Sequence, residues 1–301
     1  MELRLLHNLR KDQKGRSHCC AIVNWRDGDS TFYLRQRNAT DLAEGDSAID
    51  RVHTGGTSAA VWCLGEDTFC KAHAWCEGLE LEANTIRSVQ EKAPELPIPE
   101  VIYSRIDHPL GRTFLITKRV RGQTLERAWP QLSLAQRIQL ATDVARFCTL
   151  LAANTSPRFE TVSGCGVYEP RLMGDADPIH PTFRPRLLGP FTFDAMRAYM
   201  TTASANRPPE LDQSFHLYHE DLRPTNIMIS GDGNSVTGII DWESAAYYPR
   251  FWVATKPVFA GAFWLECETD EPKLGGQLLG RELDANGFKE QEAIFREWRV
   301  G

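Results

Sequence analysis

One stretch decides the fold, and it reads Tyr218-His219-Glu220-Asp221-Leu222-Arg223-Pro224-Thr225-Asn226-Ile227-Met228-Ile229. The turn residues Gly231-Asp232-Gly233-Asn234 follow, then an apolar run from 236 to 240, and Asp241 comes directly after that run. Two apolar runs around a glycine-containing turn predict an antiparallel β-hairpin. The returning strand would bring Asp241 back beside Asn226.

The spacing of the polar residues in this stretch is that of a kinase catalytic loop. Asp221 is the candidate base, because a carboxylate there would orient an attacking hydroxyl and accept its proton. Asn226 and Asp241 are candidate magnesium ligands, because hard divalent cations prefer oxygen ligands. We expect His219 to hydrogen-bond nearby backbone. Taken singly, the same residues could instead cap strands or start turns.

A lysine and a glutamate upstream complete the predicted constellation. Lys71 lies at the end of an expected strand, 68–72, which a turn joins to another expected strand, 59–64. In a kinase a lysine at this place contacts the α- and β-phosphates of the nucleotide. Glu82, in the first turns of an expected helix over 79–91, is predicted to pair with Lys71. Glu80 and Glu77 are the alternative partners.

Two segments are candidates for backbone contacts to a nucleotide. The loop His53–Ser58 precedes the first of these strands, and Gly55, Gly56, Thr57 and Ser58 could donate to phosphate oxygens. The loop lacks the G-x-G-x-x-G spacing, so a plain turn is the alternative. Lys118 and Val120 would offer backbone groups to an adenine edge, an expectation that rests on their position alone.

The order of elements predicts the architecture. Further strands are expected over 100–104 and 112–117, and two more in the N-terminal 48 residues, at 19–25 and 31–34. Ser133 with Gln136 forms a capping-box pattern at the start of a long helix, and helices are also expected over 191–202 and 289–299. We therefore predict an α+β, bilobal, protein-kinase-like fold. A small antiparallel N-terminal lobe with one helix would span 49–118 after an extension, 1–48, and a larger, mainly helical C-terminal lobe would span 119–301.

Composition narrows the class of protein. The chain has 301 residues, of which 42% are hydrophobic and 25% charged, as in ordinary globular proteins. Its net charge of −6 argues against a nucleic-acid partner. No apolar run approaches the roughly 20 residues that span a bilayer, so no membrane partner is expected. The eight cysteines are scattered and form no C-x-x-C pair, and without a secretory signal the expected location is cytoplasmic.

These motifs resemble the aminoglycoside phosphotransferase and choline kinase-like branch of the protein-kinase fold, and more closely the fungal phosphotransferase enzyme family. The resemblance covers about residues 49–265. It is carried by these elements, in chain order: Lys71, Glu82, Arg119-Val120-Arg121-Gly122, His219-Glu220-Asp221-Leu222, Asn226 and Ile240-Asp241-Trp242-Glu243. Glu220 stands where such proteins often have a small residue, so it adds a carboxylate near the expected acceptor.

The resemblance implies ATP as co-substrate, Mg²⁺ as cofactor and transfer of the γ-phosphoryl group to a hydroxyl of a small molecule. The chain after Asp241 has no Ala-Pro-Glu, which favours a small-molecule acceptor over a protein. Three alternatives stay open at this point. They are a nucleotide-binding pseudokinase that transfers nothing, a protein kinase, and a family member with other chemistry on a phosphorylated metabolite.

The acceptor pocket is expected within 160–200 and 243–270. The acidic residues there would suit an amine-bearing acceptor, or they could be a solvated surface run: Glu169, Asp175, Asp177, Glu266, Glu268 and Asp270. The aromatic residues could line the pocket, or they could belong to the core: Trp252, Phe259, Phe263 and Trp264.

Overall fold

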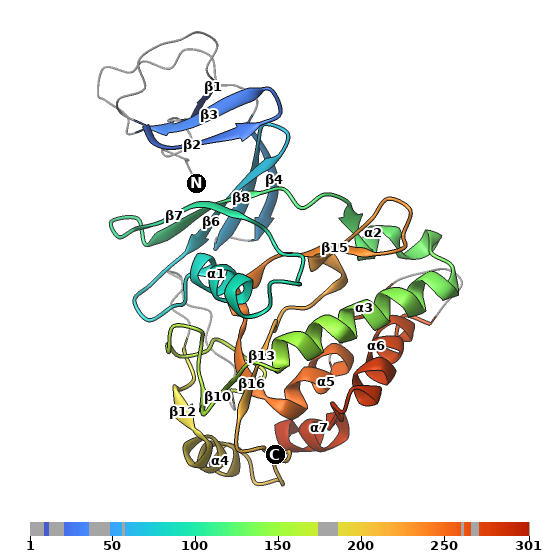
Figure 1. Ribbon diagram of the computed structural model, residues 1–301. Helices are drawn as coiled ribbons and strands as arrows, with labels where there is room; N and C mark the ends of the chain where they lie inside the picture. The colour runs from blue at the N-terminus through green and yellow to red at the C-terminus, as the bar shows by residue number, and fades with distance from the viewer. Residues whose placement is uncertain are drawn as a thin grey trace. The chain divides into compact units, whose positions relative to one another are not determined.

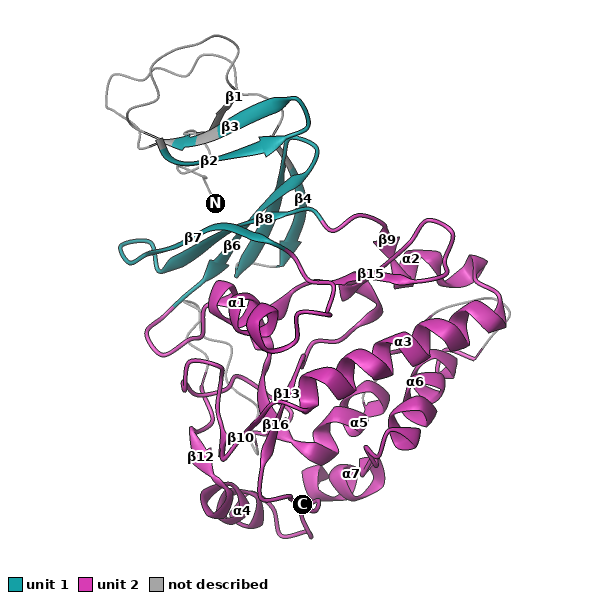
Figure 2. Cartoon of the chain, viewed as in Figure 1, with its two compact units in different colours: residues 1–75, 100–119 teal, residues 76–99, 120–301 magenta. Residues whose placement is uncertain are grey.

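The computed structural model describes residues 9–11, 21–35, 49–55, 58–173, 186–259, 262–265 and 271–300 (Figure 1). The chain divides into two compact units, drawn in teal and magenta in Figure 2. Unit 1 is Met1–Trp75 with Glu100–Arg119, and unit 2 is Cys76–Pro99 with Val120–Gly301. The three segments expected from the sequence stay a prediction.

The strands of unit 1 form two antiparallel sheets, with orders β1-β3-β2 and β4-β5-β6-β8-β7. These strands are β1 (Leu9–Lys11), β2 (Ala21–Asp27), β3 (Ser30–Arg35), β4 (Ile49–Gly55), β5 (Ala59–Leu64), β6 (Thr68–Ala74), β7 (Val101–Asp107) and β8 (Arg112–Lys118). The small antiparallel sheet predicted for the N-terminal lobe is confirmed. Strand β4 was not predicted, and it takes in Gly55, which was expected to lie in a loop.

The side chains of β5 and β6, two inner strands of the larger sheet, alternate in burial. Every second side chain of each strand is buried, which is the period of a strand with one face on a core. The buried side chains of β5, β6 and β8 share one hydrophobic cluster with three residues of the β2–β3 hairpin, Trp25, Phe32 and Leu34. The N-terminal hairpin therefore packs into the core of unit 1.

Asp27, at the end of β2, ties this hairpin to the turn between β5 and β6. Its buried carboxylate accepts hydrogen bonds from the amides of Glu66 (3.0 Å) and Asp67 (2.9 Å). The carbonyl oxygen of Asp67 accepts in turn from the amide of Arg119 (2.8 Å). The hairpin thus supports the turn, and the turn supports the last residue of unit 1.

Unit 2 holds the helices and the remaining strands among the described residues. They are α1 (Glu82–Lys92), β9 (Gln123–Thr124), α2 (Leu125–Ala128), α3 (Leu134–Ala152), β10 (Thr155–Ser156), β11 (Arg158–Phe159), β12 (Phe191–Thr192), α4 (Phe193–Thr202), β13 (Phe215–Tyr218), β14 (Ile227–Ile229), β15 (Val236–Ile239), β16 (Ala246–Pro249), α5 (Arg250–Val258), α6 (Leu274–Ala285) and α7 (Glu292–Val300). The mainly helical C-terminal region is as predicted.

Helix α3 begins where the capping box predicts. Ser133 accepts from the amide of Gln136, and the Gln136 side chain accepts from the amide of Ser133. The same glutamine donates to the carbonyl oxygen of Asp232 (2.9 Å) in the β14–β15 turn. Helix α3 runs alongside α6 (Figure 1), a helix that was not predicted from the sequence.

Strand β13 leads into the stretch 219–226 and lies between β10 and β16. The chain reaches β16 directly after Asp241, through a single 3₁₀ turn (Trp242–Ser244). Helix α5 then begins at Arg250. The segment between Asp241 and α5 is therefore a turn and a strand paired with β13, with no long intervening loop.

Candidate active site

The hairpin predicted around Asn226 and Asp241 is present. Strands β14 and β15 pair antiparallel, with Ile227 opposite Ile239. One step further along, the amide of Ile240 donates to the carbonyl oxygen of Asn226 (2.9 Å). Asp241 is the next residue, so the register of the hairpin brings the backbones of the two predicted magnesium ligands together.

Asp221 and Asn226 are linked through the Asn226 side chain. Its Nδ2 donates to Asp221 Oδ2 (3.0 Å) and to the Asp221 carbonyl oxygen (2.9 Å). Because the amide nitrogen is committed to Asp221, Oδ1 is the atom of Asn226 that could meet a cation. Arg223 Nε lies 2.5 Å from the other carboxylate oxygen of Asp221. The Asp221 side chain is 26% exposed and that of Arg223 is 52% exposed.

His219 has the structural role that the sequence suggested. The ring is buried, and Nε2 lies 3.0 Å from the carbonyl oxygen of Ile240. Its edge packs on Trp242 at a centroid distance of 4.6 Å. Burial lowers the pKa of the ring, while Asp241 and Asp221 oppose that shift. His219 thus ties the loop 219–226 to the residues on either side of Asp241.

Asp241 adopts a left-handed backbone conformation (φ 70°, ψ 60°), which is uncommon for a residue other than glycine. Carboxylate oxygens of Glu82, Asp241 and Glu243 lie within 4.8 Å of one another. Glu82 Oε1 also accepts from the amide of Trp242 (3.0 Å), which follows Asp241. Glu243 was missed from the sequence, although it stands two residues after a predicted ligand.

The oxygen donors in this region suit a hard divalent cation. The Asn226 amide oxygen and the Asp241 carboxylate are donors of the kind that Mg²⁺ takes from proteins, together with phosphate oxygens. Glu82 and Glu243 add negative charge beside Asp241. The chemistry of the residues present therefore fits the predicted cofactor.

Lys71 lies in the middle of β6, between Val61 of β5 and Leu115 of β8. The expectation that it ends the strand is wrong, because β6 continues to Ala74. Lys71 belongs to unit 1 and Glu82 to unit 2, so their pairing stays a prediction. Of the alternative partners, Glu77 is exposed and Glu80 is bound by Ser163, whose amide (2.9 Å) and hydroxyl (2.9 Å) donate to it.

The predicted nucleotide-binding backbone is partly described. The Ser58 amide (3.2 Å) and hydroxyl (3.0 Å) both donate to the Gly55 carbonyl oxygen, while Gly56 and Thr57 lie outside the described residues. The Lys118 amide donates to the carbonyl oxygen of Glu100 (2.9 Å). The Lys118 amide is therefore already hydrogen-bonded, and the contact of Lys118 and Val120 with an adenine edge stays a prediction.

A buried charged cluster lies directly beside the candidate base. Lys256 of α5 contacts Glu220 and also donates to Glu169 Oε2 (3.1 Å). Lys256 is 4% exposed and Glu169 is 1% exposed. We name Glu169, Glu220 and Lys256 the buried triad. Lys256 was missed from the sequence, although a lone lysine inside the apolar run 251–258 is a signal that could have revealed it.

The expected acceptor pocket needs correction. Glu169 is neither a solvated surface charge nor a carboxylate exposed to bind an acceptor amine, because it is buried against Lys256. Trp252, Phe259 and Phe263 are buried, and the first two pack on Phe295 in the core. Trp264 is half exposed. The other acidic residues of the same expectation lie outside the described residues: Asp175, Asp177, Glu266, Glu268 and Asp270.

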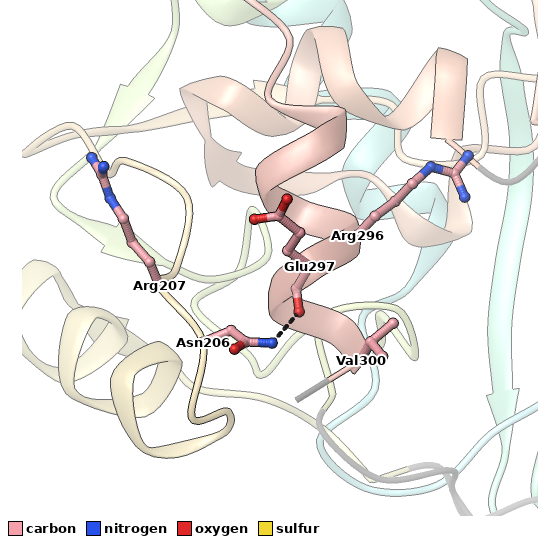
Figure 3. A pocket seen from close by; sticks show the side chains of 5 residues that line it. All are labelled: Asn206, Arg207, Arg296, Glu297 and Val300. Atoms are coloured by element: carbon pink, nitrogen blue, oxygen red, sulfur yellow. Dashed lines mark hydrogen bonds between the residues drawn. The ribbon is translucent and has the colours of Figure 1, made fainter.

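One surface pocket involves none of the predicted residues. It has a volume of about 460 Å³ and is lined by Asn206, Arg207, Arg296, Glu297 and Val300 (Figure 3). Asn206 donates across it to the carbonyl oxygen of Glu297 (2.7 Å). Arg296 is paired with Glu292 and Arg207 with Glu210. The pocket therefore lies at the exposed surface of α7, and its lining residues are distant in sequence from the β14–β15 hairpin.

Membrane-spanning helices are absent from the part of the chain that the structure describes, since none of its helices is long and apolar enough. A search of curated proteins gives no match to the chain.

Solved structures with a similar fold are aminoglycoside phosphotransferases. An aminoglycoside-3'-phosphotransferase of type VIII has a TM-score of 0.52 at 17% identity, over 84% of this chain and 92% of its own. APH(3'')-Id from Streptomyces rimosus has a TM-score of 0.52 at 18% identity, over 85% and 92%. The streptomycin–ATP ternary complex of APH(2")-IIa has a TM-score of 0.52 at 15% identity, over 84% and 82%. Identities this low support the fold alone, and that fold is the predicted protein-kinase-like one.

The sequence model described as "Phosphotransferase enzyme family" (APH) matches residues 50–252. This range contains the five-stranded sheet of unit 1 except Ile49, the stretch 219–226 and the hairpin that leads to Asp241. With two thirds of its length matched, and with the polar residues of the hairpin in the arrangement described above, the chain belongs to the phosphotransferase enzyme family.

Proposed function

We propose that this protein transfers the γ-phosphoryl group of ATP to a hydroxyl group of a small molecule. The observation that carries the proposal is the link from Asp221 through Asn226 to Asp241. The Asn226 side-chain nitrogen is hydrogen-bonded to Asp221, and its backbone carbonyl oxygen is bonded to the residue before Asp241. One short hairpin thus joins a candidate base to two candidate cation ligands.

Family membership and one neighbour support the nucleotide. The similar APH(2")-IIa structure is described as a complex with streptomycin and ATP. For this chain, Asn226 and Asp241 would hold Mg²⁺, which would neutralise charge on the phosphate oxygens. Lys71 would contact the phosphates, with Glu82 as its proposed partner. The backbone of Gly55–Ser58 and of Lys118 and Val120 would contribute further contacts.

The proposed chemical step gives Asp221 the role of base. The acceptor oxygen forms a bond to the γ-phosphorus as the bond from that phosphorus to the β–γ bridging oxygen breaks, and ADP leaves. The hydroxyl proton passes to the Asp221 carboxylate, which is partly exposed and orients the hydroxyl. The Asn226 hydrogen bond holds that carboxylate in one orientation.

The short connection after Asp241 favours a small acceptor. Only a 3₁₀ turn and β16 separate Asp241 from α5, and β16 is paired with β13. The connection from Asp241 to α5 therefore contains no long loop that could bind a polypeptide substrate. One residue that was expected to bind an amine of the acceptor, Glu169, is already paired with Lys256. The proposal therefore specifies a hydroxyl, and the rest of the acceptor is left to experiment.

The test is ATP consumption across amino-sugars, choline-like amines, sugars and hydroxylated metabolites, with Asp221→Ala as the blank. We expect at least one acceptor to be phosphorylated by the wild type, and the variant to lose turnover while it binds nucleotide with nearly unchanged affinity. Equal turnover in the variant would refute the role of Asp221. Magnesium-dependent ATP binding without consumption on any acceptor would favour a catalytically inactive nucleotide-binding protein.

A further inference from the structure

The buried triad connects three segments that are far apart in the sequence. Glu169 lies in the loop after β11, Glu220 lies between β13 and the candidate base, and Lys256 lies near the end of α5. Lys256 contacts both carboxylates. Its ammonium group also lies 5.6 Å from the ring centroid of Trp252, one turn earlier on α5. The lysine is therefore held on one side by its own helix and on the other by two loops.

Each charge in the triad depends on the others. An isolated buried ion is strongly disfavoured, so a buried carboxylate or ammonium needs a partner. Burial lowers the pKa of Lys256, and Glu169 opposes that shift. Glu169 is fixed independently, because its second oxygen accepts from the amide of Arg171 (2.8 Å). Lys256 is thus the group that connects Glu220 to a fixed point of the fold.

Glu220 is the residue immediately before Asp221. Its neighbour on the other side, His219, is bonded to the backbone beside Asp241. The catalytic loop therefore has two attachments just ahead of Asp221, one through His219 to the hairpin and one through Glu220 to α5. The second attachment joins the residue immediately before Asp221 to α5.

We propose that Lys256 is a positioning residue, which fixes Asp221 through its contact with Glu220. The catalytic part of this inference rests on the proposed function. The structural part, attachment of the loop 219–226 to α5, does not. The two parts are therefore tested by separate measurements.

The first measurement is chemical rescue of Lys256→Ala. We expect a lower Tm and faster amide hydrogen exchange in residues 219–226 than in the wild type, with no change in α3. Propylammonium should reverse both effects, because it supplies the missing cation, whereas 1-propanol should not. Lys289→Ala, at an exposed lysine, is the matched control and should change neither property. Equal rescue by the alcohol would show that Lys256 only fills space, and unchanged exchange in 219–226 would overturn the attachment.

The second measurement covers the case in which Lys256→Ala does not fold. The triple variant Lys256→Met, Glu169→Gln, Glu220→Gln removes all three buried charges together, so no unpaired ion is left. If the triad only stabilises the fold, this folded variant keeps the wild-type kcat. If it positions Asp221, we expect kcat to fall by about tenfold or more while KM for ATP is unchanged, since small misplacement of a reacting group is costly.

A third variant separates positioning from charge. Lys256→Arg keeps the cation, so its kcat should stay closer to the wild-type value than that of the single variant Lys256→Met. Equal loss in both variants would contradict the positioning role. Failure of the proposed function looks different, because the wild type itself would then show no phosphoryl transfer while the exchange and rescue results would still hold.

Discussion

The backbone of Asp241 is in a region that residues with a side chain rarely adopt, and this is where a candidate ligand stands. Such strained positions persist where the surrounding structure determines them, and they cluster at functional sites. Here the determining contacts are on both sides of Asp241. Ile240 is bonded to Asn226 through its amide and to His219 through its carbonyl, and the amide of Trp242 is bonded to Glu82.

Asp241→Asn tests whether this residue holds a cation. Asparagine tolerates left-handed backbone and keeps an oxygen donor, but it removes the negative charge. We expect magnesium-dependent ATP binding to weaken by about tenfold or more, with Tm close to that of the wild type. Titration calorimetry with and without Mg²⁺ checks this. Unchanged binding would exclude Asp241 from the metal site.

Gly122 is a second residue whose conformation the fold requires. It has φ +124°, and a Cβ there would lie 2.2 Å from the carbonyl oxygen of Ile229. We expect Gly122→Ala to lower the free energy of unfolding by about 1–3 kcal/mol, because it adds both strain and a clash. Gly231→Ala is the control, since a Cβ there meets nothing within 4 Å. Denaturant unfolding of both variants gives the comparison, and equal stabilities would contradict the expectation.

At the scale of elements, the N-terminus of α3 and the catalytic hairpin are joined by one side chain. Gln136 completes the capping box and also donates to Asp232 in the β14–β15 turn. Gln136→Ala should therefore lower the free energy of unfolding by about 1–2 kcal/mol, the cost of a lost cap and hydrogen bond. Gln139→Ala, on the exposed side of the same helix, should change it by less than about 0.5 kcal/mol. A hairpin whose amide exchange is unaffected by Gln136→Ala would show that the contact does not stabilise it.

Local sequence signals were sufficient to predict the β14–β15 hairpin and helix α3. The hairpin was predictable because glycine and asparagine mark its turn and apolar residues mark its strands, and α3 was predictable from Ser133 and Gln136. Strand β4 was missed because it begins in a polar stretch, where register with β5 decides the structure. Such pairing is a long-range property that composition does not show.

The contrast between local sequence signals and long-range contacts also applies inside the candidate site. The proximity of Asn226 and Asp241 could be predicted because one hairpin sets it, while the roles of Asp221, Asn226 and Asp241 stay a prediction. The buried triad could not be predicted, because its members come from three separate segments and meet only in the fold. The sequence shows Glu169 as one more acidic residue in a polar region, and only burial distinguishes it from a surface charge.

At the scale of the whole molecule, each of the two units contains a buried cysteine whose reactivity reports the unfolding of that unit. Cys70 is buried in unit 1 and Cys148 in unit 2, and burial raises the pKa of each thiol to about 12. At a pH of about 8 only about one thiol in ten thousand would be ionised, and the thiolate is the reactive form. Both cysteines should therefore resist iodoacetamide in the native protein.

Peptide mass spectrometry after timed alkylation measures this resistance. Cys165, which is half-buried, should be modified before either of them. With added denaturant, Cys70 should report the opening of unit 1 and Cys148 that of unit 2, each at its own midpoint. Rapid modification of either residue in native buffer would contradict the burial described here.

The buried triad also restricts how this sequence can change over generations. Lys256 is the cation that both buried carboxylates share, so its loss alone would leave two buried charges without a countercharge, whereas loss of one glutamate leaves Lys256 paired with the other. Diverging descendants of this chain should therefore keep Lys256 for as long as either glutamate remains. Residue 256 of α5 and the residue next to the candidate base would then change in a fixed order, with a glutamate replaced first.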